Sequence, residues 1–251
     1  MPRIIAETDE IVVVDKPAGL IVHSDGRTSE PSLADWILKE YPALAGVGEP
    51  WISPQGESIL LPGIVHRLDR TTSGVMLIAK TPEMYTYLKN EFKERRVEKV
   101  YRAFVYGHME TGEGKIVAEI MRSSEPPRRW YCRPQVPTND PSARPCVEND
   151  NRAAITDWRL LMHLADTETG ELASYIEVQP KTGRTHQIRV HLASIGHPVV
   201  ADHLYAAYST PVLGFKRPAL HAYNISFIMK GSREIFTATL PDDFKRIESE
   251  A

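Results

Sequence analysis

The sequence has few of the features that mark a specialised class of protein. Its 251 residues contain only two cysteines, Cys132 and Cys146, which cannot form a disulfide framework and belong to no Cys-x-x-Cys motif. No apolar run approaches the ~20 residues that a membrane helix needs, and residues 1–10 lack the apolar stretch of a signal peptide. These absences favour a soluble, cytoplasmic protein with no membrane partner.

A strong net charge is also missing. The formal net charge is −3 and 42% of the residues are hydrophobic, which is typical of a globular protein and does not by itself indicate a nucleic-acid partner. Basic residues nevertheless gather in three places, with aromatic and imidazole rings among them, a mixture that suits phosphate contacts and base stacking. The clusters are Lys89, Lys93, Arg95, Arg96, Lys99 and Arg102; Arg122, Arg128, Arg129 and Arg133; and Lys181, Arg184 and Arg189. Any one of them alone would be typical of a solvated face.

Local signals predict several helices and strands. Apolar runs predict strands over 11–15 and 75–79, and alternation predicts another over 99–107. A capping box at Ser32–Asp35 and a Thr-Pro-Glu start at Thr81 each predict a helix, the first ending at Pro42. A third helix is expected to open from a turn with an N-cap in Thr182–Thr185.

The remaining segments are predicted to be irregular. Residues 43–62 read as a long loop, and residues 122–152 as an irregular or hairpin insertion. Helices and strands alternate without a regular βαβ rhythm, so we expect an α+β fold with a mixed or antiparallel sheet. No linker divides the chain, which predicts one domain over 1–251.

The stretch His66-Arg67-Leu68-Asp69-Arg70-Thr71-Thr72-Ser73-Gly74 carries the most chemistry. If it is extended, Arg67 and Asp69 point one way and His66 and Leu68 the other. A neighbouring cation would keep the Asp69 carboxylate ionised, fit to act as a nucleophile, a general base or a metal ligand. A structural ion pair that anchors the loop fits the motif equally well, and the residues leave this choice open.

Other chemistries find less support. His66, His186, His191 and His197 could bind a metal, but His186 and His191 lie five residues apart, about 140° around a helix, without acidic partners nearby. No Gly-x-Ser-x-Gly elbow is present, and the Gly-Arg-Thr-His-Gln-Ile-Arg segment lacks the lysine of a phosphate loop. We therefore favour an RNA-facing site without a metal.

Four motifs in this order resemble the RluA-type pseudouridine synthases: KPAGLIVH from Lys16, HRLDRTTSGVMLIAK from His66, KVYRAFVYG from Lys99 and KTGRTHQIRVHLASIGHPVVAD from Lys181. The resemblance extends from about Ile11 to Phe244. It implies a catalytic domain with a mixed, largely antiparallel central sheet and a basic cleft. The chain differs in its longer stretches 43–62 and 122–152, and we expect no separate N-terminal RNA-binding domain.

The resemblance also implies roles for individual residues. Asp69 would be the nucleophile, Tyr101 would pack on the target base and take part in proton transfer, and Arg189 would pair with the aspartate. Arg67 would fill the space left by a flipped uridine. Independently of the resemblance, Arg184 and Lys99 of the basic clusters are expected to bind RNA.

The implied reaction turns uridine into pseudouridine in structured RNA, either tRNA or rRNA. Its atoms balance, so no redox cofactor, ATP or metal is expected, and the protein is expected to act as a monomer. A flipped base costs a few kcal/mol of stacking, which explains the need for a wedge and an aromatic platform. Two alternatives are an inactive RNA-binding protein of the same fold and a metal-dependent hydrolase acting at His66–Asp69.

Overall fold

The computed structural model describes residues 1–24, 30–53, 56, 58–123, 129–132, 153–207 and 209–250, with only the backbone at 249 and 250. Most of the predicted insertion at 122–152 lies outside these residues. The chain forms two compact units: Met1–Lys99 with His221–Pro241, and Val100–Leu220 with Asp242–Ala251. Each unit is described by itself.

The first unit is a mixed sheet with two helices. Its strands run in the order β1 (Arg3–Glu7), β2 (Ile11–Lys16), β5 (Ser73–Ala79), β11 (Leu220–Met229) and β12 (Ser232–Thr237). Only β5 and β11 are parallel; the other neighbours are antiparallel. All seven residues of β5 are buried, as expected for a strand covered on both faces. The helices are α1 (Leu33–Glu40) and α2 (Pro82–Lys93).

Both helices of this unit begin where local signals predict. Ser32 and Asp35 form the complete capping box, and the Thr81 side chain accepts from the Met84 N–H. The prediction of one long loop over 43–62 is wrong in part. A 3₁₀-helix, η1 (Pro42–Gly46), and a short hairpin of β3 (Trp51–Ile52) and β4 (Ser58–Ile59) lie there, since short elements leave little periodic signal.

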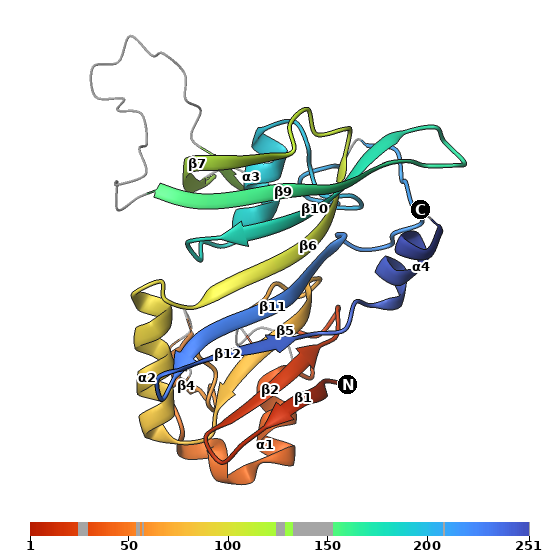
Figure 1. The fold of residues 1–251 in the computed structure, drawn as a ribbon. Coiled ribbons are helices and arrows are strands. Elements are labelled where there is room, and N and C mark those ends of the chain that lie inside the picture. Colours follow the sequence, from red (N-terminus) through yellow and green to blue (C-terminus); the bar gives the residue numbers. More distant parts are fainter. Residues whose placement is uncertain are drawn as a thin grey trace, which may run out of the picture. The chain divides into compact units, whose positions relative to one another are not determined.

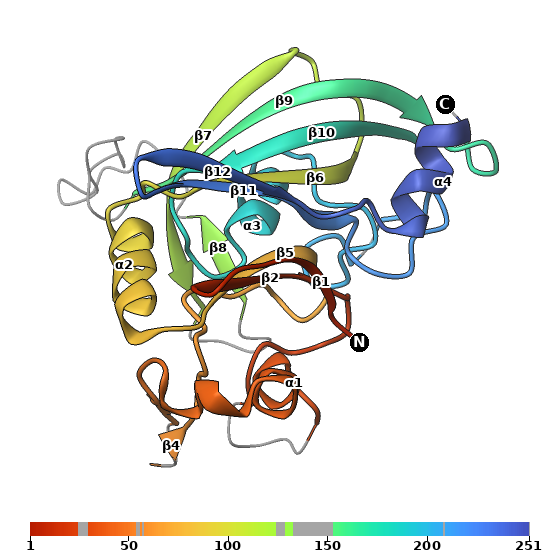
Figure 2. The same ribbon diagram turned by 60° about the horizontal axis from the view of Figure 1, so that its bottom comes forward.

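The second unit is an antiparallel sheet with one helix on its face. The strand order is β6 (Glu98–Tyr106), β10 (Leu172–Pro180), β9 (Ala153–Ala165), β7 (Glu113–Arg122) and β8 (Trp130–Cys132). The helix α3 (Gln187–Ser194) contacts β7 to β10, and α4 (Asp242–Glu250) lies near the ends of β9 and β10 (Figures 1 and 2). Phe244 of α4 joins an aromatic core with Phe104, Tyr175 and Phe215.

These elements confirm the predicted fold class, α+β with a mixed, largely antiparallel sheet. The prediction of a single domain over 1–251 stays a prediction. Within the described residues, no helix is both long and apolar enough to cross a membrane.

Candidate active site

Asp69 lies on an extended segment that leads into β5. Burial alternates along it as the sequence predicts: Arg67 is exposed, Leu68 is buried and Asp69 is half-buried. The Thr72 N–H donates to the Asp69 carbonyl at 3.1 Å and closes a turn directly before the strand. Leu68 therefore anchors the segment in the core, and Asp69 beside it stays partly exposed.

The turn after β2 holds the peptide that follows this aspartate. Lys16 is fully buried, and its ammonium donates to the carbonyl oxygens of Pro17 at 3.0 Å, Leu20 at 2.8 Å and Arg70 at 3.3 Å. The Gly19 N–H donates to the same Arg70 carbonyl at 2.8 Å. A buried ammonium is costly unless it is hydrogen-bonded, and here backbone carbonyl groups supply the acceptors. Sequence reasoning treated this lysine only as part of a turn, because lysine is rarely fully buried.

His66 supports the loop from the other side. Its Nε2 accepts the Leu77 N–H of β5 at 2.9 Å, and its ring stacks on Phe92 with 4.7 Å between centroids. Burial, followed by the positive charge of Lys99, lowers the pKa of His66 to about 3. The ring is therefore neutral and its Nε2 lone pair is already used. His66 holds the loop and is not poised as a metal ligand.

Small residues after the motif let β5 pass close to β11. Gly74 has φ +122°, and a Cβ there would collide with the backbone of Ala222. Next to it, the Ser73 hydroxyl and His221 Nδ1 are 2.9 Å apart in the buried interior. The Ser-Gly pair thus serves backbone packing, which explains why these small residues precede a core strand.

In the second unit, the side chain of Gln187 fastens the start of α3. Its Oε1 accepts from the Thr182 hydroxyl at 2.7 Å and the Arg184 N–H at 3.0 Å, and its Nε2 donates to the Ile155 carbonyl at 2.9 Å. The residue before the helix is His186, in the left-handed region at φ 55° with no side-chain cap. The N-cap predicted within Thr182–Thr185 is therefore wrong, because Gln187 satisfies these groups from inside the helix.

The helix α3 is buried on nearly every side. Helical spacing from Gln187 to Ile195 predicts that Ile188, Leu192 and Ile195 face the core. Ile188 and Leu192 do, but Ile195 is 39% exposed because the helix ends at Ser194. Arg189 is also buried, with only 7% of its surface exposed. A guanidinium in such a place requires a partner.

That partner within the second unit is Asp202. Arg189 donates from Nε to Oδ2 at 2.6 Å and from Nη2 to Oδ1 at 2.8 Å, a bidentate pair with a fully buried carboxylate. The guanidinium carbon lies 5.1 Å from the centre of the Tyr205 ring. The sequence assigned no role to Asp202 or Tyr205, although an acid two residues after the apolar pair Val199–Val200 is an available signal.

Tyr101 lies on the face of the sheet that α3 covers. It pairs with Val178, which pairs with Trp158, and residues directly opposite each other share a face. Thr156, two residues before Trp158, receives a hydrogen bond from Gln187 of α3 at 3.0 Å. Half-buried Tyr101 and Arg189 of α3 therefore belong to the same side of the second unit.

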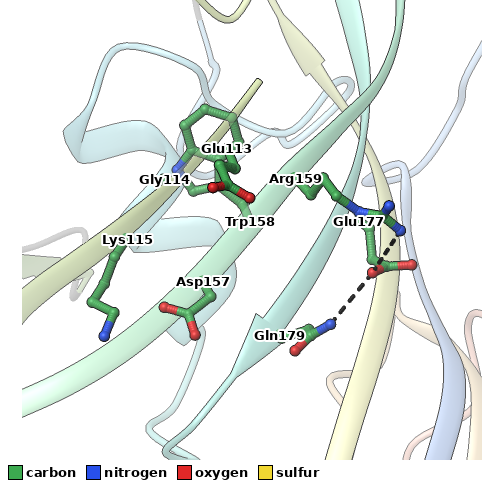
Figure 3. A pocket seen from close by; sticks show the side chains of 8 residues that line it. All are labelled: Glu113, Gly114, Lys115, Asp157, Trp158, Arg159, Glu177 and Gln179. Atoms are coloured by element: carbon green, nitrogen blue, oxygen red, sulfur yellow. Dashed lines mark hydrogen bonds and ion pairs between the residues drawn. The ribbon is translucent and has the colours of Figure 1, made fainter. Parts of the chain in front are cut away.

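The opposite face of this sheet carries a ladder of alternating charges (Figure 3). Arg102 Nη1 lies 2.8 Å from Glu177 Oε2, and Arg159 Nη2 lies 3.3 Å from Glu177 Oε1. The adjoining hollow of about 520 Å³ also carries Glu113 and Lys115 at its edge. The positive and negative side chains pair across strands and largely balance, so this hollow is a sheet face lined by ion pairs. It contains no residue predicted for the site.

The predicted RNA contacts are accessible. Arg67 and Arg184 are exposed, and Lys99 is half-buried. Among the residues that the structure describes, no group of three or more His, Cys, Asp or Glu side chains could hold a metal ion.

Comparison with known proteins identifies the family of this chain. Residues 10–194 match the family model described as RNA pseudouridylate synthase. An uncharacterized RNA pseudouridine synthase of Synechocystis sp. is 34% identical over 95% of this chain and 64% of its own length. The dual-specificity RNA pseudouridine synthase RluA of Vibrio parahaemolyticus is 32% identical over 96% of this chain and 83% of its own length.

A ribosomal large subunit pseudouridine synthase D from Zymomonas mobilis is also 32% identical, over 97% of this chain and 70% of its own length. Among solved structures, human RNA Pseudouridylate Synthase Domain Containing 1 is similar in fold, with a TM-score of 0.70 and 24% identity over 96% of this chain and 84% of its own. The chain belongs to the RNA pseudouridylate synthase family, a family of isomerases, and the predicted resemblance to RluA-type members is confirmed.

Proposed function

We propose that this protein converts uridine to pseudouridine in structured RNA, either tRNA or rRNA, with Asp69 as the nucleophile. The observation that carries the proposal is the setting of Asp69. Asp69 is half-buried, while buried Lys16 and half-buried His66 hold the surrounding backbone in place. A carboxylate that must meet a substrate needs this combination of access and fixed position.

The reaction is an isomerisation. The bond between ribose C1′ and uracil N1 breaks, the uracil turns, and a bond forms between C1′ and C5. The C5 proton leaves and N1 gains a proton, so nothing is oxidised or reduced. An ionised carboxylate in contact with the nucleotide is the one charged group that this sequence of bonds requires from the protein.

The remaining residues serve base flipping and RNA binding. Arg67, exposed beside Asp69, would occupy the space that the uridine leaves in the stack. Tyr101 would stack on the flipped base and assist proton transfer through its hydroxyl. Arg184 and Lys99 would contact phosphates. Arg189 would serve as the cation that keeps the Asp69 carboxylate ionised and oriented in the reacting complex.

A pseudouridine-specific chemical probe on RNA incubated with the protein tests the proposal. We expect new modified positions in tRNA or rRNA with the wild-type chain and none with Asp69→Asn. Asp9→Asn, which removes an exposed carboxylate, is the control and should modify RNA normally. The names of relatives such as the Zymomonas mobilis protein make large-subunit rRNA the first RNA to test.

RNA that binds without any new pseudouridine would contradict the proposal and support the alternative, an inactive RNA-binding protein. A loss of activity on adding a chelator would instead indicate metal chemistry. Tyr101→Phe should bind RNA normally and turn over slowly, because the ring remains and the hydroxyl is lost; unchanged turnover in Tyr101→Ala would assign the tyrosine to packing alone.

A further inference from the structure

Asp202, the buried acid that pairs with Arg189, has no role in the proposed function. We infer that Asp202 is a positioning residue: it sets the orientation of the Arg189 guanidinium and thereby the rate of the chemical step. This inference rests on the proposed function of Arg189. The geometry that points to it lies wholly within the second unit.

Asp202 engages one edge of the guanidinium. The Nε and Nη2 groups of Arg189 donate to its two carboxylate oxygens at 2.6 and 2.8 Å. Two parallel hydrogen bonds fix the plane of the guanidinium as well as its position. These two bonds use the Nε–Nη2 edge of the guanidinium. Asp202 therefore sets the direction of the whole group, and the role proposed for Arg189 depends on that direction.

Asp202 is itself held firmly. Its Oδ1 also accepts the backbone N–H groups of Leu204 at 3.1 Å and Tyr205 at 3.2 Å. The Arg189 guanidinium lies over the Tyr205 ring. The Tyr205 hydroxyl is 2.9 Å from Nδ1 of His186, the residue directly before α3, so this ring is held by the start of the same helix. The edge and one face of the guanidinium are thus both supported by the segment 202–205.

This arrangement separates orientation from charge. Arginine stays protonated in proteins, so loss of the Asp202 charge would leave the Arg189 charge in place and remove its support. The buried, already paired guanidinium is also poorly placed to attract RNA phosphates. We therefore expect Asp202 to act on turnover and not on RNA affinity.

The test is Asp202→Asn, measured as single-turnover pseudouridine formation at saturating RNA and as RNA affinity. Turnover should fall roughly 10- to 100-fold, the usual loss for a group that orients a reacting side chain, with little change in affinity. The matched control is Asp243→Asn. Asp243 makes the same bidentate fork with Arg217, at 2.8 and 3.0 Å, in the same unit. This control should keep normal turnover.

A double-mutant comparison distinguishes positioning from general support of the fold. In an Arg189→Ala background, Asp202→Asn should cause no further loss of turnover, because there is no guanidinium left to orient. Asp202→Glu keeps the charge and moves the carboxylate by one methylene, so it should fold and still turn over slowly. It provides the measurement if the asparagine variant does not fold.

Normal turnover in Asp202→Asn or Asp202→Glu would overturn the inference alone, as would equal losses with and without Arg189. If the wild-type protein forms no pseudouridine in any RNA, the proposed function fails and the inference fails with it.

Discussion

The Asp69 loop of the first unit and the Arg189 helix of the second are fixed by different kinds of hydrogen bond. Two hydrogen bonds of the loop each join one side chain to one backbone group: Lys16 donates to the Arg70 carbonyl, and His66 accepts the Leu77 N–H. The helix adds a pair between two charged side chains, Arg189 and Asp202, to the bonds of the Gln187 amide. Asp69 is half-buried, whereas Arg189 is buried.

The difference matches what each group is proposed to do. A nucleophile must meet the substrate, so its side chain cannot be used up in holding the loop. A cation that tunes a carboxylate needs a fixed direction more than access, and a dry environment strengthens its effect. The same kind of substitution should therefore have a different effect in the Asp69 loop than in the Arg189 helix.

The largest expected effect is on turnover, and it distinguishes the roles of Asp69 and Arg189. Asp69→Asn should lose turnover by several orders of magnitude, because the nucleophile itself is gone. Arg189→Lys keeps a charge without the planar fork and should lose roughly 10- to 100-fold. RNA affinity should change little in either. Single-turnover rates at saturating RNA check both, and a larger loss in Arg189→Lys than in Asp69→Asn would reverse the assignment of roles.

The next effect concerns the backbone anchor of the loop. Lys16→Met leaves the partly buried Pro17 and Leu20 carbonyl groups without this donor and should lower the free energy of unfolding by about 2–4 kcal/mol. Lys39→Met, which alters an exposed lysine of α1, should change it by less than about 0.5 kcal/mol. Urea denaturation of the two variants measures the difference. Equal stabilities would mean that the loop does not depend on the lysine.

A smaller effect is expected from pH, through His66 in the first unit and His191 in the second. Burial lowers the pKa of His66 to about 3 and that of His191, which bonds Thr156, to about 4. Both pKa values lie below the unfolded value of about 6.5, so the stability they confer is complete above that pH. It is lost progressively as the pH falls from about 6.5 towards the folded pKa values.

Each histidine should contribute up to about 1.4 kcal/mol per pH unit to this loss. His66→Gln, compared with wild type between pH 6.5 and 5 where carboxylates contribute little, should have about half the slope. Unfolding free energies measured by urea across this range check it. An unchanged slope in His66→Gln would show that the His66 ring is accessible to protons in the folded state.

The smallest effect should come from the exposed arginine before α3. Arg184→Ala should weaken RNA binding without changing turnover at saturation, and it should reduce the slope of log affinity against log salt by about 0.7–0.9 for one lost phosphate contact. Arg159→Ala is the control, since its side chain is also exposed but belongs to the ladder with Glu177. If the arginine control alters the salt slope equally, RNA also contacts the opposite face.

Much of the fold could be read from short-range patterns. The starts of α1 and α2 depend on residues within one turn, such as Ser32 with Asp35 and Thr81 with Met84. The segment around Leu68 alternates because an extended chain has a period of two. The 3₁₀-helix and the hairpin within 43–62 were not predicted, because these elements are only two to five residues long.

The sequence by itself determined the family, the α+β class and the identity of the candidate groups Asp69, Tyr101 and Arg189, because ordered motifs and local periodicity are properties of the chain alone. Only the tertiary structure decided how the site is supported. The Arg70 carbonyl that accepts from Lys16, the donor to His66 and the acid paired with Arg189 are 54, 11 and 13 residues away, beyond the reach of a helical period. Hydrogen bonds depend on distance in space, and no spacing rule links such residues before the chain has folded.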